Sequence, residues 1–271
     1  MRAAAALLIV TALQSGCEPD AGHTSHAVRN ALPTPELDAV VGLLADGELY
    51  CSGTLIAPRV VLTAAHCVDR YVSDETTVIA AFFGPRLDQP APVVTAERVV
   101  RHPDWRFDDF PNDIGLVALA DNAPVDPLPA STIALTTDFV GTDLTLVGFG
   151  LTGPDSGDSG IRRAGIAGVT GIDDQRLALN SGPEGASTCA GDSGGPSLLD
   201  GRVVGVHSRS SCSTLSLDER VDVHAAFIDP FVAEHPALED SGCNAGAGGS
   251  PWWLALLILA VPGARRLRDG R

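Results

Sequence analysis

The feature that most constrains the fold is a series of short apolar segments, separated by turn residues, that runs through most of the chain. Each has the length of a strand, and Gly, Pro, Asn and Asp residues separate them. The expected strands are residues 39–44, 54–56, 60–63, 78–83, 93–100, 114–119, 144–147, 161–169, 175–179, 197–199 and 203–206. The 29 glycines and 19 prolines suit tight turns better than long helices. The sequence therefore predicts an all-β fold.

One helix is expected at the end of this series, over residues 225–235. Phe227, Phe231 and Val232 recur there at helical spacing, while Pro230 predicts a kink or an early end. A chain of 271 residues is long enough to bury a core without metal or disulfide support. We expect a single helix to cover part of a β-rich body.

The boundaries of that body follow from composition. Residues 18–35 are polar and lack apolar periodicity, which indicates a linker or propeptide before a folded domain of residues 36–240. The Pro-rich segment 121–131 divides the domain into two halves, and residues 155–160 form a Gly- and Ser-rich loop. We therefore expect two structural halves within one domain.

The first 17 residues are typical of a signal peptide. Arg2 precedes an apolar run, and small residues precede Cys17. This junction also resembles a lipoprotein cleavage site, although Gln14 stands where that pattern has an aliphatic residue. Two alternatives remain open: lipidation of Cys17, which would anchor the chain to a membrane, or ordinary cleavage nearby.

Residues 241–271 form a second candidate processing signal. Cys243 begins a small-residue stretch, residues 252–261 are apolar, and an Arg-rich end follows. The apolar run is shorter than the 20 or so residues of a permanent membrane span. The order resembles that of bacterial C-terminal sorting tails, and the alternative is a fraying amphipathic end. We expect an exported protein, either extracellular or anchored at the cell surface.

The six cysteines of an exported chain are expected to pair for the most part. Cys17 and Cys243 belong to the terminal signals, which leaves four for the body. These four fall into two pairs that each close a short loop: Cys51 with Cys67, and Cys189 with Cys212. The sequence therefore predicts two disulfides in the folded body.

No cofactor, metal or nucleic-acid partner is expected. The cysteine spacing is not that of a zinc site, and His23 and His26 lie in the polar N-terminal segment, where such pairs are usually linker. The formal net charge is −16 and every basic residue is Arg, which argues against a nucleic-acid-binding surface. The acidic balance is explained by a solvated surface, with a weak preference for basic substrates as the alternative.

Two motifs place catalytic residue types beside expected strands. His66, in the sequence TAAHC, follows the strand 60–63, a position that suits a general base and equally a structural histidine. Asp113, in NDIGL, precedes the strand 114–119, where a buried carboxylate could orient an imidazole. Neither motif is specific by itself.

A third motif is more informative. Ser193 lies in GDSGGP, where glycine neighbours leave its backbone free of side chains and allow N–H groups to point at one spot. That arrangement is typical of a nucleophile beside an oxyanion hole.

Together, TAAHC, NDIGL and GDSGGP, in this order, resemble the motifs of the chymotrypsin/trypsin-like serine peptidases. The order of His, Asp and Ser separates this resemblance from subtilisin-like and α/β-hydrolase enzymes. The resemblance covers residues 28–234 or so. It implies two six-stranded antiparallel β-barrels with the site between them, a short C-terminal helix, and a monomeric endopeptidase acting on proteins or peptides.

The same resemblance assigns roles. It implies that His66 is the general base, Asp113 its orienting carboxylate and Ser193 the nucleophile that forms an acyl-enzyme. The backbone N–H groups of Gly191 and Ser193 would bind the oxyanion. Both cysteine pairs match family disulfides, one beside the histidine loop and one beside the substrate pocket.

The specificity pocket departs from that of trypsin-like members. Ser187 stands at the base, where those enzymes carry an Asp that pairs with Arg or Lys, so cleavage after basic residues is not expected. Ser210 and Ser216 match the pocket walls and Ser208 the strand that binds substrate, which predicts a small or medium uncharged side chain. The alternative is that these serines face solvent. The other body histidines are expected to be ordinary surface or core groups: His102, His207, His224 and His235.

Activation is the remaining departure. In the family, the residue matched by Asp192 pairs with an α-amino group released by cleavage before an Ile-Val-Gly-Gly start, which this chain lacks. The bonds Ala27–Val28 and Arg29–Asn30 are the candidate cleavage sites. Without that partner Asp192 is an unpaired buried charge. The alternatives to an active enzyme are an unactivated zymogen, an inactive binding module and a surface-anchored structural protein.

Overall fold

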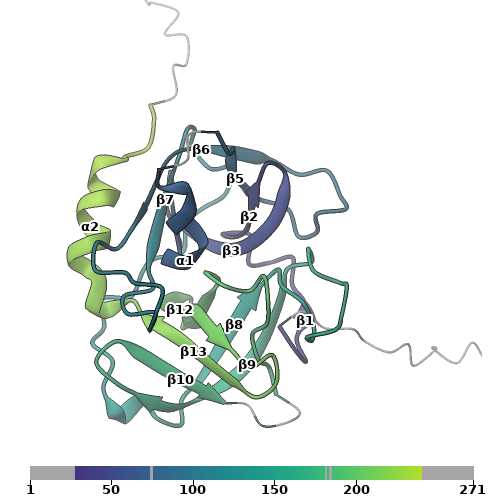
Figure 1. Cartoon of the computed structure of the whole chain (residues 1–271), viewed down its shortest axis with the longest axis vertical. Coiled ribbons are helices and arrows are strands. Elements are labelled where there is room, and N and C mark those ends of the chain that lie inside the picture. Colours follow the sequence, from purple (N-terminus) through teal and green to yellow (C-terminus); the bar gives the residue numbers. More distant parts are fainter. Residues whose placement is uncertain (1–27, 74–75, 181, 183–184, 240–271) are drawn as a thin grey trace, which may run out of the picture. The chain divides into compact units, whose positions relative to one another are not determined.

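The computed structural model describes residues 28–73, 76–180, 182 and 185–239. Its first barrel is closed and antiparallel, with strand order β2-β3-β4-β7-β6-β5 (Figure 1). The strands are β2 (Val40–Ala45), β3 (Glu48–Ala57), β4 (Val60–Thr63), β5 (Ile79–Phe82), β6 (Val93–Arg101) and β7 (Gly115–Leu119). Each corresponds to a segment expected from the apolar pattern.

The second barrel is built from the strands that follow residues 121–131. They are β8 (Asp143–Gly148), β9 (Arg163–Ile172), β10 (Arg176–Asn180), β11 (Pro196–Leu199), β12 (Arg202–Ser210) and β13 (Leu215–Arg220). Pairing of β8 with β9 closes the ring, and the short β1 (Leu32–Pro33) adds to the edge of β9. The prediction of two six-stranded antiparallel barrels is confirmed.

The helices are few and short. They are α1 (Ala65–Val68), the 3₁₀ helices η1 (Asp69–Tyr71), η2 (Thr137–Phe139) and η3 (Asp222–His224), and α2 (Ala225–Glu234). The expected C-terminal helix is α2, which contains Pro230 and buries Ile228 and Phe231 against the core. None of the helices in the described part of the chain is long and apolar enough to cross a membrane.

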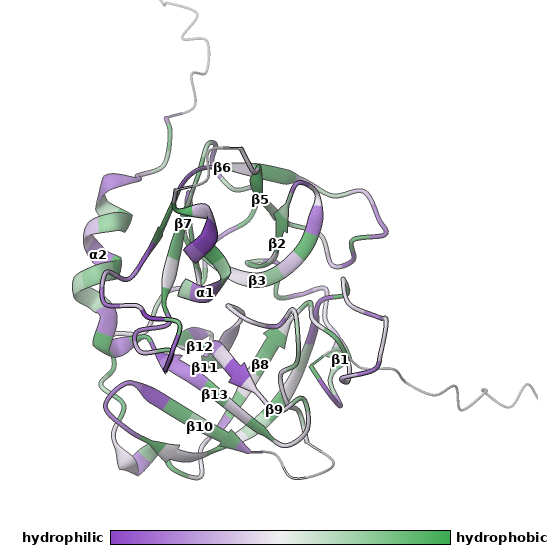
Figure 2. Cartoon of the chain, in the orientation of Figure 1, coloured by the Kyte–Doolittle hydropathy of each residue, from purple (hydrophilic) through white to green (hydrophobic). Residues whose placement is uncertain are grey.

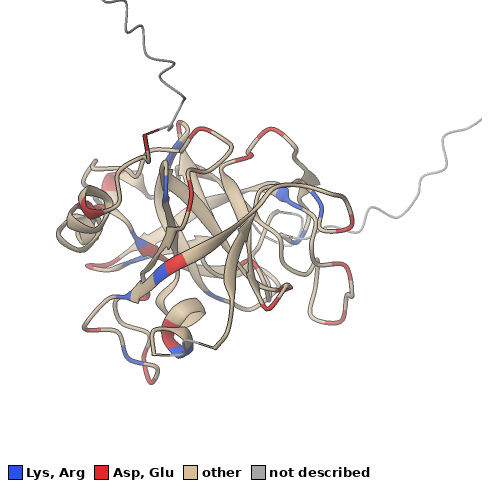
Figure 3. Ribbon diagram, turned by 90° about the horizontal axis from the view of Figure 1, so that it is seen from above, with Lys and Arg blue, Asp and Glu red and all other residues tan. Residues whose placement is uncertain are grey.

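Apolar side chains fill the barrels and the contact between them. All four residues of β4 are buried, as are all five of β7, and the apolar strands appear green in Figure 2. One cluster joins the first barrel to Phe149, Leu198 and Val206 of the second. Acidic residues lie mostly in loops in the view of Figure 3. The apolar core therefore extends across both barrels, and most acidic residues lie in the loops.

Two regions differ from the expectations drawn from the sequence. Residues 28–35 were expected in a linker or propeptide, yet Val28 and Ala31 belong to the core of the second barrel. Strand β13 was not expected at all, because Asp218, Glu219 and Arg220 hide its pattern although all three are buried. Buried charged residues interrupt the apolar pattern from which strands are predicted.

The terminal predictions lie outside the described residues. These are the signal peptide 1–17 with Cys17, the histidines His23 and His26, and the tail 241–271 with Cys243.

Candidate active site

The first barrel places His66 beside Asp113. His66 lies in α1, directly after β4, and Asp113 lies just before β7, which pairs with β4. The Asp113 carboxylate lies 2.8 Å from His66 Nδ1 through Oδ2 and accepts the His66 backbone N–H at 2.9 Å through Oδ1. Ser208 Oγ donates to Oδ2 at 2.6 Å. Asp113 is fully buried and acts on both the ring and the backbone of His66.

This geometry fixes the imidazole. A carboxylate on Nδ1 keeps the proton there, so that Nε2 is the nitrogen left to exchange protons with a substrate. The rings of Trp105 and Phe110 flank His66, with centroids 6.5 and 5.6 Å from that of the histidine. Sequence reasoning missed both aromatic residues, because nothing in their sequence context sets them apart from core residues.

The loop of Ser193 is attached to the first barrel. The Ser193 carbonyl accepts the backbone N–H of Ser52 at 2.8 Å, and Ser52 follows Cys51, whose disulfide to Cys67 is formed. A Cβ on Gly194 would lie 2.0 Å from Thr63 Oγ1, and this glycine has φ +82°. Only glycine fits there, so the sequence GDSGGP allows the Ser193 loop to approach β3 and β4.

The expected oxyanion donors are available. Within the described part of the chain, the backbone N–H groups of Gly191 and Ser193 donate to no protein acceptor. Ser52 Oγ donates to the Gly191 carbonyl at 2.8 Å and accepts from the Phe149 N–H at 3.0 Å, which holds the Gly191–Asp192 peptide in place between the two N–H groups. Among the described residues no hydrogen bond joins Ser193 Oγ to His66 Nε2, a contact that commonly tightens only when substrate binds.

Asp192 is fully buried beneath this loop. Its carboxylate accepts the N–H of Cys189 at 2.9 Å and that of Gly150 at 2.8 Å. Burial raises the pKa of Asp192 to about 6, against the lowering effect of these hydrogen bonds and of the Val28 backbone. A Cβ on Gly148 would lie 2.2 Å from Asp192 Oδ1, so glycine is needed to admit the carboxylate. The start of the described chain and the Ser193 loop therefore meet at the Asp192 carboxylate.

A cavity of about 210 Å³ opens beside Ser193 in the second barrel. It is lined by Thr188, Cys189, Ala190, Ser193, His207, Ser208, Arg209, Ser210 and Cys212. The predicted disulfide Cys189–Cys212 is formed at its side. This cavity is the candidate specificity pocket.

The structure separates the four serines expected in that pocket. Ser208 and Ser210 line it, while Ser187 and Ser216 do not. Ser187 is buried and pairs with Arg29 in an antiparallel bridge, and Ser216 Oγ accepts from both the N–H and the hydroxyl of Thr188. His207 lines the cavity although it was expected to have no function.

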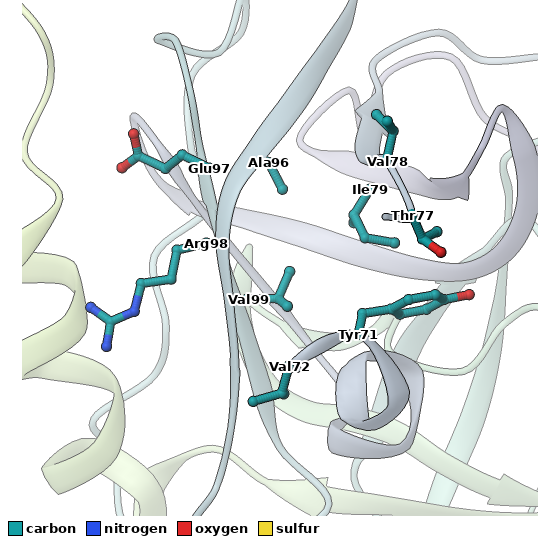
Figure 4. Close-up of a pocket in the computed structure, with 9 residues that line it drawn as sticks. All are labelled: Tyr71, Val72, Thr77, Val78, Ile79, Ala96, Glu97, Arg98 and Val99. Carbon is teal, nitrogen blue, oxygen red and sulfur yellow. The ribbon is translucent and has the colours of Figure 1, made fainter. Parts of the chain in front are cut away.

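Two further features offer no alternative site. Cys51, His66 and Cys67 gather at metal-ligating distance among the described residues, but the two sulfurs form the disulfide. A cavity of about 450 Å³ between Tyr71, Ile79 and β6 contains none of the expected catalytic or specificity residues (Figure 4).

Known proteins are similar to most of the described chain. The family model described as Trypsin matches residues 31–227. "Serine protease SP24D" of Anopheles gambiae is 33% identical over 179 residues, 61% of this chain and 64% of that protein, so the chain spans less than two thirds of its length. "Trypsin" of Saccharopolyspora erythraea is 27% identical, over 70% of this chain and 83% of that protein.

Two other similarities restrict the conclusions about activity. "Inactive CLIP domain-containing serine protease A3" of Aedes aegypti is 27% identical over 60% of this chain and 41% of that protein, so likeness alone does not establish activity. The solved structure of neuropsin, a serine protease of mouse brain, matches with TM-score 0.63 and 21% identity, over 75% of this chain and 97% of that one. At that identity the likeness shows the fold alone.

Proposed function

Since this chain belongs to the trypsin family of serine proteases, we propose that it is an exported endopeptidase whose catalytic residues are His66, Asp113 and Ser193. The observation that supports this most is the buried Asp113 carboxylate, which lies 2.8 Å from Nδ1 of His66 and also accepts its backbone N–H. An imidazole held in this way is prepared to remove a proton from a neighbouring hydroxyl.

In the proposed reaction, Ser193 Oγ attacks the carbonyl carbon of the scissile peptide while His66 Nε2 takes its proton. The N–H groups of Gly191 and Ser193 donate to the oxyanion, and loss of one such donor costs about 2.7–4 kcal/mol of barrier. His66 then gives the proton to the leaving amine, which leaves an acyl-enzyme on Ser193. Water, deprotonated by His66, attacks the ester and regenerates the hydroxyl.

Activation by cleavage of the Ala27–Val28 bond is part of the proposal. Val28 is fully buried, and its backbone favours the ionised form of Asp192. A new α-amino group at Val28 would therefore form an ion pair with this carboxylate and stabilise the loop that carries the oxyanion donors. The alternative site, Arg29–Asn30, receives no such support, because Arg29 is paired through its backbone with Ser187.

Export rests on the sequence of residues 1–17 and on the two disulfides, which persist in oxidising compartments. Attachment to a cell envelope through Cys17 or the tail 241–271, the comparison of that tail with bacterial sorting signals, and a monomeric state stay predictions. Protein or peptide substrates are those of the family.

The rival is an inactive relative or an uncleaved zymogen. Two measurements separate them: cleavage of a mixed peptide library by protein purified from culture, and labelling by a fluorophosphonate. Cleavage and labelling that both disappear in Ser193→Ala would support the enzyme. Labelling and cleavage that stay absent after the Ala27–Val28 bond has been cut, verified by N-terminal sequencing, would reject it.

A further inference from the structure

His207 is a buried imidazole with one nitrogen unused. It lies on β12 and is 1% exposed. Its Nδ1 lies 3.0 Å from Asp218 Oδ2, while its Nε2 has no hydrogen-bond partner among the described residues. Buried polar atoms in folded proteins nearly always have partners, so the unpartnered ring nitrogen of a residue that lines a cavity requires an explanation.

The His207 ring is held in place by residues of the neighbouring strands. His207 and Asp218 are directly paired residues of β12 and β13, and Ser197 Oγ donates to Asp218 at 2.5 Å. Asp218 and Ser197 are both fully buried. A Cβ on Gly195 would lie 3.2 Å from His207 Cδ2, which shows how closely the backbone packs against the ring. Such support suits a group that must present one nitrogen in a fixed direction.

The surroundings of His207 favour a positive charge. Burial alone lowers its pKa, but Asp218 on β13 and Asp192 on the Ser193 loop together raise it above the ordinary histidine value. The carbonyl of Val147 on β8 also favours the cation, although no acceptor in the described part of the chain meets hydrogen-bond geometry with Nε2. In the cation both ring nitrogens are donors, so Nε2 requires an acceptor.

The cavity wall points to the same ligand charge. None of the described residues that line the cavity is acidic, and two of them, His207 and Arg209, are basic. The Arg209 guanidinium lies over the Phe110 ring and donates to the Asp109 carbonyl. The hydroxyls on the wall are engaged: Ser208 donates to Asp113, and Ser210 donates to the Thr188 carbonyl. The imidazole is therefore the donor available to a side chain that enters the pocket.

We propose that the pocket beside Ser193 accepts an acidic side chain, glutamate or aspartate, from the residue whose carbonyl is attacked, and that His207 Nε2 donates to its carboxylate. The inference rests on the proposed peptidase function and names its substrate class. It replaces the sequence-based expectation of an uncharged side chain, and it gives His207 a role in specificity.

The test compares peptides that differ only at the attacked residue, with Glu, Asp, Gln or Ala there, using protein cut at Ala27–Val28. The wild type should cleave the better of the two acidic peptides about 30-fold or more faster, in kcat/KM, than the Gln peptide at pH 6.5. His207→Gln should reduce this ratio to about 3 or less while cleavage of the Ala peptide persists. Equal cleavage of acidic, Gln and Ala peptides by the wild type would overturn the inference.

A matched control separates specificity from folding. His224 is also a buried histidine, paired with Glu219 at 2.7 Å, but it does not line the cavity, so His224→Gln should keep the wild-type ratio. If His207→Gln does not fold, Asp218→Asn provides a second variant, because it removes the charge that favours the cation. The preference for acidic peptides should also fall as pH rises and His207 loses its proton.

A binding measurement distinguishes this inference from the proposed activity. Calorimetry on Ser193→Ala needs no turnover, and peptides ending in Glu, Asp or Gln serve as probes. Tighter binding of an acidic peptide, lost when His207→Gln is added, would support the pocket assignment even if the wild type cleaved nothing. Equal binding of all three probes would reject it even if cleavage by Ser193 were established.

Discussion

The molecule holds two carboxylate–imidazole pairs that share a design and differ in exposure. Asp113 faces Nδ1 of His66, and Asp218 faces Nδ1 of His207. A serine hydroxyl donates to each carboxylate, Ser208 to the first and Ser197 to the second. The His66 side chain is 20% exposed and the His207 side chain 1%.

That difference in exposure fits the different roles proposed for the two histidines. An imidazole open to substrate and water can exchange protons in each turnover, as the proposed catalysis requires of His66. An imidazole buried beside a carboxylate has its charged form favoured, and it can recognise a ligand without taking part in bond breaking. Under the two proposals, the same local chemistry provides a base at His66 and a fixed hydrogen-bond donor at His207.

The largest expected effect tests whether His66 acts as the base while His207 only selects the substrate side chain. His66→Gln should lower kcat/KM for every peptide by about 10⁴-fold or more, because no base remains to activate Ser193. His207→Gln should leave cleavage of the Ala peptide within about 10-fold of the wild type, because His207 only selects the side chain. Steady-state kinetics on both variants measure these changes in kcat/KM. A loss of about 10³-fold on the Ala peptide for His207→Gln would show that the division is wrong.

The next effect concerns the loop that brings Ser193 to the first pair. Gly194→Ala places a Cβ 2.0 Å from Thr63 Oγ1 at φ +82°, and we expect a loss of about 3–4 kcal/mol of stability with loss of activity. Gly141→Ala is the control, since φ is +91° there but nothing lies within 4 Å, and it should cost about 1–2 kcal/mol. Urea unfolding measures both. Equal losses would mean that strain in φ alone, and not the close approach, requires the glycine at 194.

Asp192 lies near His207 and should make the uncut protein sensitive to pH. Its pKa in the folded state, about 6, lies above the ordinary value of 3.8, so the folded protein retains a proton that the unfolded chain releases. This contribution to stability is complete below about pH 4 and is lost as pH rises to about 6, by about 2–3 kcal/mol. After cleavage of the Ala27–Val28 bond, the Val28 ammonium should lower the pKa of Asp192 and remove this loss of stability.

Unfolding of Ser193→Ala protein at pH 4 and pH 6.5, before and after cleavage, measures the effect. Asp192→Asn in the uncut protein is the control and should lack this part of the pH dependence. If the cut and uncut proteins respond to pH alike, Val28 does not supply the partner of Asp192.

The smallest effects come from the two serines that support the carboxylates. Ser208→Ala removes a 2.6 Å hydrogen bond from Asp113 and should lower kcat by about 10-fold. Ser197→Ala removes the equivalent bond from Asp218, and it should lower stability by about 1–3 kcal/mol and weaken the preference for acidic peptides, with kcat on the Ala peptide unchanged. Kinetics and thermal unfolding separate the two outcomes. A similar fall in kcat for both variants would show that the pairs are coupled.

Sequence reasoning located the first pair more readily than the second. His66, Asp113 and Ser193 lie in three motifs that together resemble those of the chymotrypsin/trypsin-like peptidases, and cysteine spacing indicates the disulfides. The first pair and the disulfides could therefore be predicted. His207 looks like an ordinary strand residue, and its partner Asp218 lies on β13, whose buried charges conceal the strand. The second pair is made by register between strands, which a single sequence does not display.

The hydrogen bond from the Ser52 N–H to the Ser193 carbonyl joins the first barrel to the loop that carries Ser193. The strands of the first barrel are all present once residue 119 has been synthesised, but this bond needs residue 193, and the second barrel is complete only at residue 220. A chain emerging from the ribosome therefore holds only the first-barrel part of the proposed centre, His66 and Asp113, until residue 193 has been added. Under the proposed function, the nascent chain therefore has no complete centre before the second barrel has been synthesised.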